Sequence, residues 1–423
     1  MIRYTYPQET NWPSLCSRPT FDLSELEEKV KSILLEVKVR GDKALLEFGQ
    51  KFDNVSLASV VKDIQPQGYT IDEELGQAIK IAKTNLEKFH TSQKESPRKI
   101  ETTTGVTCWR KSLAIENVGL YIPGGSAPLF STLLMLAIPA QIAGCKNIVV
   151  CTPPTKDGEL DETIAWTCQL LGINRIYLVG GAQAVAGMTF GTESIPKVDK
   201  IFGPGNQFVT AAKQLAQNYG VAIDMPAGPS EVLVIADHTA NPAFVAADLL
   251  SQAEHGPDSQ VVLVSNDGQL VSKVEEEVER QVALLPRKSI ALKALENSQS
   301  VLLRSTEDCV KFSNIYAPEH LIIATEGAEE LGEQITIAGS VFLGHWSCES
   351  AGDYASGTNH TLPTNGYARN YSGVSLDSFV KKITFQRLSE EGIKSIGPAV
   401  EKMAEAEQLI AHKNAVTERL NAL

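Results

Sequence analysis

VGLYIPGG (residues 118–125) is followed along the chain by KNIVVCTPP (146–154), RIYLVGG (175–181), VDKIFGPGN (198–206) and VAIDMPAGPS (221–230). Each segment is a short apolar run, rich in β-branched residues, that ends close to Gly or Pro, and such runs are typical of buried strands. Apolar residues at helical spacing fill the intervening segments 129–143, 161–171, 182–190 and 207–219. This alternation of strand and helix predicts a parallel sheet.

The same alternation starts again at EVLVIAD (231–237). Further apolar runs then recur between helical segments: SQVVLVS (259–265), VLLRS (301–305), HLIIAT (320–325) and GSVFLG (339–344). We therefore expect an α/β fold with two parallel-sheet domains. They are Rossmann-like but incomplete, since the chain has no GxGxxG fingerprint. Small helical segments are expected at the N-terminus and at the C-terminus.

The regions outside these two series differ in pattern. Helical periodicity runs from Phe21 to about Glu95 and resumes after Phe379, whereas residues 350–373 are rich in Gly, Asn, Ser and Thr and predict a long irregular loop. The predicted division is an N-terminal arm (1–24), a first α/β domain (25–115 with 228–376), a second α/β domain (116–227) and a C-terminal helical tail (377–423).

Composition disfavours some classes of partner and location. Lys and Arg number 38 against 51 Asp and Glu, which gives a net charge of −13 and disfavours binding to nucleic acid or to an anionic membrane. The seven cysteines are scattered without CxxC spacing, which indicates a reducing compartment. The first residues lack the pattern of a signal peptide, so we expect a cytoplasmic protein without a membrane anchor.

Gln252 and His255 in SQAEHGPD are candidate metal ligands. They occupy positions i and i+3 of an expected helix that stops at Gly256-Pro257, so their side chains share one face. The negative end of the helix dipole favours a cation there, and Zn²⁺ accepts imidazole nitrogen and oxygen ligands. A buried histidine that is hydrogen-bonded at a helix C-terminus is the open alternative.

Glu319 and His320 in APEHL are candidates for proton transfer. They lie between Pro318 and the apolar run 321–324, at the start of an expected strand. Adjacent side chains diverge within a regular strand, so both can face one site only if the turn holds them there. Histidine is the side chain best suited to acid–base work near neutral pH. A solvated surface pair is the alternative.

Asp353 and His360 lie in the glycine-rich segment, where Asp353 is a candidate carboxylate ligand and a turn-capping role is the alternative. Glu407 and His412 are five residues apart in the C-terminal region. On one regular helix this spacing puts their side chains about 140° apart. They can serve one site together only if the helix ends between them.

Three glycine motifs follow expected strands: PGG (123–125), GGAQ (180–183) and GPGN (203–206). The free amides at a helix start can hold phosphate, and the carboxyl ends of strands in an open sheet are the usual place for ligands. Each motif by itself is more often a tight turn than a phosphate site.

Eight segments, in this order and over nearly the whole chain, closely resemble the histidinol dehydrogenase family: VGLYIPGG, GGAQA, GPGN, AGPSE, LLSQAEHGPDSQ, NIYAPEHL, GDYASGTNHTLPT and AEQLIAHKNAV. The resemblance implies two successive NAD-dependent oxidations, of L-histidinol to L-histidinal and then to L-histidine, with zinc as a second cofactor. It also implies a domain-swapped homodimer with shared active sites.

The resemblance further implies roles for particular residues. The zinc ligands would be Gln252, His255, Asp353 and His412, with His412 contributed by the partner subunit. The family's NAD positions match Tyr121, Gln183 and Asn206. The substrate contacts would be Ser230, Gln252, His255, His320, Asp353, His360, Glu407 and His412. The first α/β domain would then carry most of the site, the second would bind NAD, and the tail would reach the partner.

Within this scheme, His320 acts as the general base and Glu319 activates water for the second oxidation. The main alternative is a cysteine-dependent aldehyde dehydrogenase, for which Cys108, Cys145 and Cys151 are candidates, although none lies beside a candidate base in the sequence. A zinc hydrolase or a binding module without catalysis would show no NADH formation.

Overall fold

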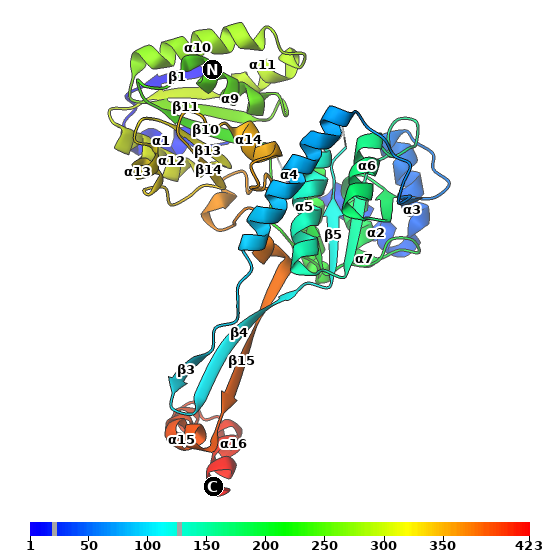
Figure 1. Ribbon diagram of the computed structural model, residues 1–423, viewed down its shortest axis with the longest axis vertical. Coiled ribbons are helices and arrows are strands. Elements are labelled where there is room, and N and C mark those ends of the chain that lie inside the picture. Colours follow the sequence, from blue (N-terminus) through cyan, green and yellow to red (C-terminus); the bar gives the residue numbers. More distant parts are fainter. Residues whose placement is uncertain (19–22, 125–128) are drawn as a thin grey trace.

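Two six-stranded sheets, each built from one strand series, form the body of the molecule in the computed structural model (Figure 1). The structure describes residues 1–18, 23–124 and 129–423. The expected start of the first helix at Phe21 and Gly125 of the PGG motif lie outside these residues. Within the described ranges, no helix has the length and apolar character needed to cross a membrane.

The first sheet is entirely parallel and has the order β1-β12-β11-β10-β13-β14. Its strands are β1 (Ile2–Thr5), β10 (Glu231–Ala236), β11 (Gln260–Ser265), β12 (Gln299–Leu302), β13 (His320–Ala324) and β14 (Ser340–Leu343). One face is covered by α9 (Pro242–Ala253), α10 (Gly268–Val282) and α11 (Lys288–Glu296). The other face is covered by α1 (Trp12–Leu15), α12 (Thr306–Tyr316) and α13 (Ala328–Gly332).

The second sheet has the order β2-β7-β6-β5-β8-β9, with only β2 antiparallel to its neighbour. Its strands are β2 (Val61–Asp63), β5 (Asn117–Tyr121), β6 (Asn147–Thr152), β7 (Arg175–Leu178), β8 (Lys200–Phe202) and β9 (Ala222–Ile223). These two sheets confirm the predicted α/β class. In both, the first strand of the series is central, with the second and third on one side and the fourth and fifth on the other.

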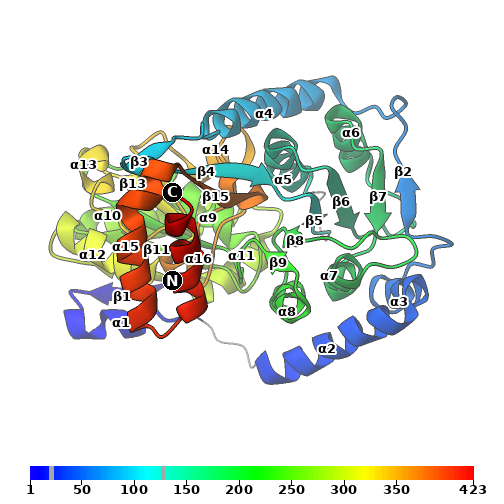
Figure 2. The same cartoon turned by 90° about the horizontal axis from the view of Figure 1, so that it is seen from below.

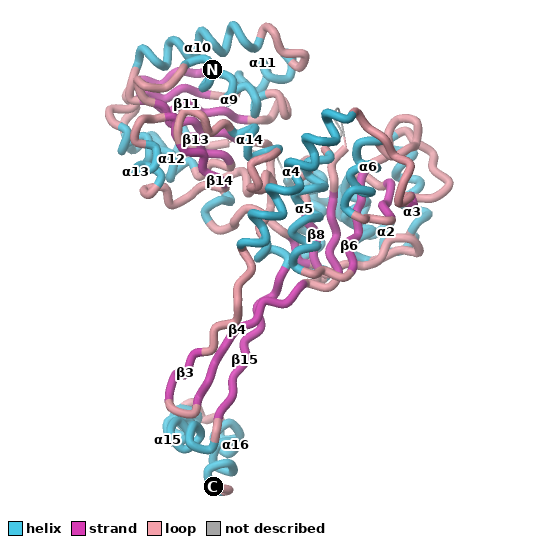
Figure 3. The backbone as a smooth tube through the Cα atoms, viewed as in Figure 1, coloured by secondary structure: helices cyan, strands magenta, loops and turns pink. Residues whose placement is uncertain are grey.

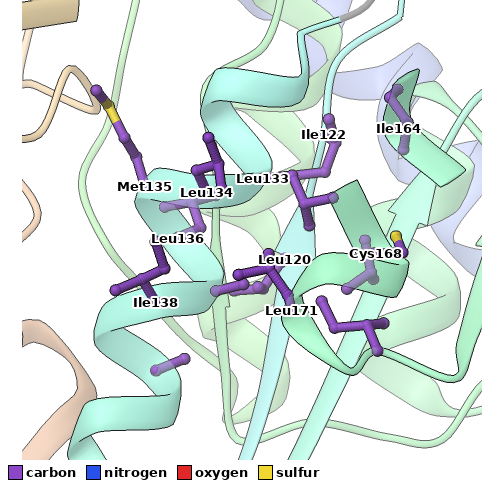
Figure 4. Packing of buried hydrophobic residues seen from close by; sticks show 14 of the residues in the cluster. Leu120, Ile122, Leu133, Leu134, Met135, Leu136, Ile138, Ile164, Cys168 and Leu171 are labelled. Carbon is purple, nitrogen blue, oxygen red and sulfur yellow. The ribbon is translucent and has the colours of Figure 1, made fainter. Parts of the chain in front are cut away.

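Helices cover both faces of the second sheet. One face carries α4 (Glu73–Ser92), α5 (Phe130–Ala143) and α6 (Glu162–Leu171), and the other carries α2 (Leu23–Arg40), α3 (Asp42–Phe48), α7 (Gly181–Phe190) and α8 (Gln207–Ala216) (Figure 2). Helix α5 is largely apolar because it is packed between the sheet and α4. Figure 4 shows its Leu133 and Leu136 in the same apolar layer as Leu120 of β5 and Cys168 of α6.

This arrangement differs from the predicted domain division. Residues 25–92 were expected with the first sheet, but α2, α3, β2 and α4 pack on the second. Residues 2–5, expected in an arm, form an edge strand of the first sheet. Apolar periodicity shows which face of a helix is buried, but it does not show which sheet buries that face.

A third, antiparallel sheet extends away from the body as a stalk (Figures 1 and 3). It consists of β3 (Ile100–Thr103), β4 (Val106–Ala114) and β15 (Val380–Leu388), and it ends in a hairpin of α15 (Glu390–Ala406) and α16 (Ile410–Asn421). The prediction of helix directly after Phe379 is therefore wrong for β15. Pairing with β4 over its whole length, including stacking of Phe385 on Trp109, makes this segment a strand.

Candidate active site

The candidate catalytic side chains gather at the amino ends of the two central strands of the first sheet. Glu319 precedes β13, His320 is its first residue, and the neighbouring strand β10 starts at Glu231. The candidate cofactor residues lie instead at the carboxyl edge of the second sheet, where Tyr121 ends β5. Ligands of open sheets usually bind at the carboxyl ends of the strands. The candidate residues of the second sheet follow this rule, whereas those of the first sheet lie at the opposite edge.

Glu319 and His320 are held together against Gln252 of α9. Nε2 of Gln252 lies 3.0 Å from Nδ1 of His320 and donates to Oε2 of Glu319 at 3.5 Å. The turn before β13 contains Ala317 at a φ of +59°, and both side chains after it are buried at the same place. The turn before β13 therefore holds both side chains at one site, which two adjacent residues of a regular strand would not allow.

Asp353 completes the cluster from a short helix. It lies on α14 (Glu349–Tyr354), so the segment expected to be irregular from residue 350 begins with a helical turn. Oδ1 of Asp353 lies 3.3 Å from Nε2 of His320. Nδ1 of His255, at the end of α9, lies 3.3 Å from Oγ of Ser230.

His360 links this cluster to the second sheet. Its Nδ1–H donates to the carbonyl oxygen of Asp353 at 3.0 Å, and its Nε2 accepts from the Thr132 hydroxyl of α5 at 3.0 Å. Both ring nitrogens therefore have protein partners. A substrate contact at either nitrogen requires the exchange of one of these hydrogen bonds.

Three carboxyl groups and one imidazole share this buried space. Burial raises the pKa of Glu319. Burial also raises the pKa of Glu349 to about 8, against the attraction of His320. Burial alone would lower the pKa of His320, but the surrounding carboxyl groups, Glu319 first, outweigh it and hold that pKa well above its usual range. Burial would raise the pKa of Asp353, but the hydrogen bond with His320 and the positive charge of His320 lower it below its usual value.

Several polar atoms of the cluster are buried without a well-aligned hydrogen bond. They are Oε1 of Gln252, Nε2 of His320, Oε2 of Glu349 and Oδ1 of Asp353. Ligand atoms of His320, Glu349 and Asp353 lie within 4.8 Å of one another. Unsatisfied buried oxygens and a ring nitrogen are costly unless a ligand completes them, so the donor set fits a divalent cation such as zinc.

The candidate cofactor residues surround glycines at the edge of the second sheet. The backbone amide of Gly181 donates to the Tyr121 hydroxyl at 3.1 Å, and Gln183 is buried two residues further along α7. Gly203 has a φ of +124°, and a Cβ there would lie 2.1 Å from the carbonyl oxygen of Tyr121. Asn206 caps α8 by accepting from two of its first amides, which are therefore not free for a phosphate.

A cavity of about 470 Å³ is lined by residues from the domains of both sheets. It lies between the start of α8 and the amino ends of β10 and β11, and Asn206, Ser230 and His255 line it. The volume is in the range of small-molecule sites. Residues from both sheets can therefore contact one bound molecule.

Two predicted site residues are not brought to this cluster. Glu407 and His412 are exposed in the distal helical hairpin, at the opposite end of the stalk (Figure 1). Helix α15 ends at Ala406, Gln408 has a φ of +60°, and α16 starts at Ile410. Residues 407–409 therefore interrupt the helix, so Glu407 and His412 do not lie on one regular helix and the objection based on their spacing is removed.

Sequence reasoning missed two residues of the cluster. Glu349 lies four residues before Asp353, a spacing that places both on one face of α14, and this was a usable signal. Glu231 meets the cluster mainly through its backbone: its amide donates to Oε2 of Glu319 at 2.8 Å, and its carbonyl oxygen lies 3.2 Å from Nδ1 of His320. Backbone groups have no side-chain signature in a sequence.

Fold and site together define a two-domain α/β enzyme with a buried cluster of ionisable side chains beside a cavity. The histidinol dehydrogenase family profile matches residues 16–420. Histidinol dehydrogenase from Bacteroides thetaiotaomicron is 57% identical over 421 residues, which cover 99% of this chain and 98% of that protein. The enzyme of the same name from Escherichia coli K12 is 54% identical over 415 residues, 97% of this chain and 95% of that one.

Solved structures agree with these relatives. The crystal structure of histidinol dehydrogenase from Elizabethkingia anophelis superposes with a TM-score of 0.97 at 59% identity and covers 100% of this chain and 98% of that one. The chain belongs to the histidinol dehydrogenase family. It is an NAD-dependent oxidoreductase of histidine biosynthesis.

The cysteine-dependent alternative receives no support from the site. An acetylating aldehyde dehydrogenase from Geobacillus thermoglucosidasius shares the fold, with a TM-score of 0.50 at 15% identity over 88% of this chain and 93% of that one. Yet burial raises the pKa of the Cys145 thiol to about 11 and that of Cys151 further, so neither is a ready thiolate. Cys108 lies in the stalk strand β4.

Proposed function

We propose that this protein oxidises L-histidinol through L-histidinal to L-histidine, a four-electron oxidation that uses NAD and zinc. The observation that carries the proposal is the buried contact of Glu319 and His320 with Gln252, beside Asp353. A base, a second carboxyl group and unsatisfied ligand atoms meet within one site, as two successive oxidations of one carbon require.

Zinc is proposed to be held by Gln252, His255, Asp353 and His412 of the partner subunit. The unsatisfied Oε1 of Gln252 and Oδ1 of Asp353 support this set. The alternative group of His320, Glu349 and Asp353 shares one residue with it but would occupy the nitrogen that His320 needs as a base. Bound zinc would hold the imidazole and amine nitrogens of the substrate and orient its alcohol carbon.

In the first oxidation, we propose that Nε2 of His320 removes the hydroxyl proton while the carbon loses hydride. In the neutral form of His320, Nδ1–H donates to the carbonyl oxygen of Glu231 and the lone pair is on Nε2. A bound divalent cation would favour this neutral form, because its charge opposes the carboxyl groups that raise the pKa of His320. NAD supplies the hydride acceptor. The proton and the hydride leave the same substrate group, so His320 must lie beside that carbon.

In the second oxidation, we propose that Glu319 activates a water that adds to the aldehyde. The resulting hydrate has a hydroxyl proton that His320 removes as the second hydride leaves. Burial raises the pKa of Glu319, which makes its carboxylate a stronger base than an exposed one.

The remaining predicted contacts divide between the two ligands. Ser230 and His255, which line the cavity, would contact substrate together with His360. Asn206, which also lines the cavity, would contact NAD together with Tyr121 and Gln183. Glu407 and His412 would contact the substrate of the partner subunit. This requires a homodimer with shared active sites, because both residues lie on the distal hairpin of α15 and α16. The proposed place of this reaction is the cytoplasm, where the seven free thiols stay reduced.

The test is NADH formation by purified protein with L-histidinol, before chelation, after chelation and after zinc is restored. We expect two NADH for each histidinol and recovery with zinc. One NADH for each histidinol would contradict the water-activating role of Glu319. No NADH at all would overturn the proposed function.

A further inference from the structure

Glu231 contacts three predicted site residues through one pair of backbone groups. Its amide donates to Oε2 of Glu319 at 2.8 Å. Its carbonyl oxygen accepts from Nε2 of Gln252 at 3.3 Å and lies 3.2 Å from Nδ1 of His320. The orientation of these two groups at the start of β10 therefore determines where the acid–base pair points.

The side chain of Glu231 fixes that orientation from the opposite direction. Arg18, far away in the sequence, binds both carboxylate oxygens with Nε and Nη2, each at 2.8 Å. The backbone amide of Asn365, in the glycine-rich segment, donates to the same carboxylate at 2.9 Å. The Glu231 side chain is only 3% exposed and that of Arg18 12%, so little water competes for these contacts.

Arg18 is itself held rigidly. Its guanidinium lies 3.9 Å from the centre of the Tyr316 ring, and Nη2 also donates to the carbonyl oxygen of Ala317 at 3.3 Å. Ala317 belongs to the turn that leads into Glu319 and His320. A planar guanidinium in a bidentate contact with a carboxylate is more specific in direction than a single hydrogen bond. The Arg18–Glu231 pair thus connects the start of β10 to the turn before β13.

We propose that Glu231, clamped by Arg18, is a positioning residue for Glu319 and His320. The clamp holds the Glu231 amide against the carboxylate of Glu319 and its carbonyl oxygen against Nδ1–H of His320. The carbonyl contact selects the imidazole tautomer whose Nε2 is free to accept a proton. This inference rests on the proposed function and adds residues that act on the reaction through the catalytic pair.

The test compares Arg18→Met, Arg18→Lys and Glu231→Gln with the wild-type protein. The control is Arg3→Met, because Arg3 also lies near the N-terminus and pairs with a glutamate of the first domain, Glu275, but on the exposed surface. The readouts are the pre-steady-state rate of the first NADH formed from L-histidinol, kcat with supplied L-histidinal, and bound zinc, each per folded chain. Circular dichroism measures the folded fraction.

We expect Arg18→Met to lower the rate of the first NADH formed from histidinol by about 10- to 100-fold, the scale of a small misplacement of catalytic groups. The loss with histidinal should be larger, because the second oxidation uses both Glu319 and His320. Arg18→Lys should retain more activity than Arg18→Met, because lysine keeps the positive charge although it loses the bidentate contact with the Glu231 carboxylate. Arg3→Met should behave as wild type.

Equal loss of the first-NADH rate and of kcat with histidinal, or unchanged values of both in folded Arg18→Met, would overturn the inference. If Glu231→Gln does not fold, the two Arg18 variants still decide the question. A wild-type protein that forms no NADH overturns the proposed function. An active wild-type protein with an unaffected Arg18→Met variant overturns only the positioning role.

Discussion

Oδ1 of Asp353 lies 3.3 Å from Nε2 of His320, so the carboxylate proposed to bind zinc also faces the nitrogen proposed to act as base. The two residues come from different elements, α14 and β13. The role of Asp353 as a zinc ligand can therefore be tested by measuring zinc affinity, without any measurement of turnover.

Asp353→Asn should weaken zinc binding by about 100-fold or more, because it replaces a charged ligand by a neutral one at a buried site. Competition with a chromogenic chelator measures the affinity. The matched control is Asp377→Asn, since Asp377 pairs with Lys382 on the exposed base of the stalk. An Asp353→Asn protein that holds zinc as tightly as wild type would remove Asp353 from the ligand set.

Glu319→Gln should separate the two oxidations. The amide cannot activate water, so the second oxidation should slow by about 10²- to 10⁴-fold while the first continues. Histidinal should then accumulate with one NADH for each histidinol, as measured by absorbance and an aldehyde trap. His320→Gln should lose both steps, and the exposed Glu330→Gln should lose neither. Two NADH from Glu319→Gln would exclude the assigned role.

Two inactive variants should restore activity when their chains are mixed. If Asp353 and His412 of the partner subunit serve one site, a dimer of one Asp353→Asn chain and one His412→Ala chain has one intact site and one doubly altered site. Random re-association of equal amounts should give about a quarter of wild-type activity. Activity that stays at the level of the separate variants would mean that the sites are not shared.

Breaking the buried ion pair of Lys213 and Asp224 should destabilise the second domain and loosen its GPGN turn. Both side chains are almost fully buried, Lys213 donates to the carbonyl oxygen of Gly203 at 2.8 Å, and Asp224 accepts from the Gly203 amide at 2.8 Å. Lys213→Met leaves an unpaired buried charge, which costs roughly 3–5 kcal/mol.

Urea unfolding measures this loss, and steady-state kinetics should show a higher KM for NAD with an unchanged KM for histidinol. The control is Lys146→Met, because its partner Glu116 is on the surface. An unchanged KM for NAD in a destabilised Lys213→Met protein would show that the pair supports the fold alone.

Asp248→Asn should stabilise the protein more at pH 8 than at pH 4. Burial raises the pKa of Asp248 from 3.8 to about 7. Between these values the folded chain holds a proton that the unfolded chain has released, so this group's contribution to stability falls as pH rises from about 4 to 7. An asparagine cannot ionise and avoids that loss. Melting temperatures of both proteins at the two pH values provide the measurement, and an equal difference at both would contradict it.

Much of the body could be predicted from local pattern. Short β-branched runs ending near Gly or Pro marked the parallel strands of both sheets, and i, i+3 spacing placed Gln252 and His255 at the end of one helix. The sequence also identified Glu319, His320 and Asp353 as a group, through the family resemblance of the segments that contain them. These signals are local, because strand and helix periodicity depends on neighbouring residues.

Tertiary structure alone decided what those elements contact. Residues 380–388 form a strand because β4 pairs with them. Helices α2 and α4 pack on the second sheet because their apolar side chains are buried against its two faces. Glu231 contacts the site through its backbone amide and carbonyl groups. Every non-proline residue has these groups, so the sequence gives no signal for this contact. The sequence by itself determined the strand series and the chemical groups available. Only the packing of distant segments decided which of these groups meet, because contact between them depends on the whole chain.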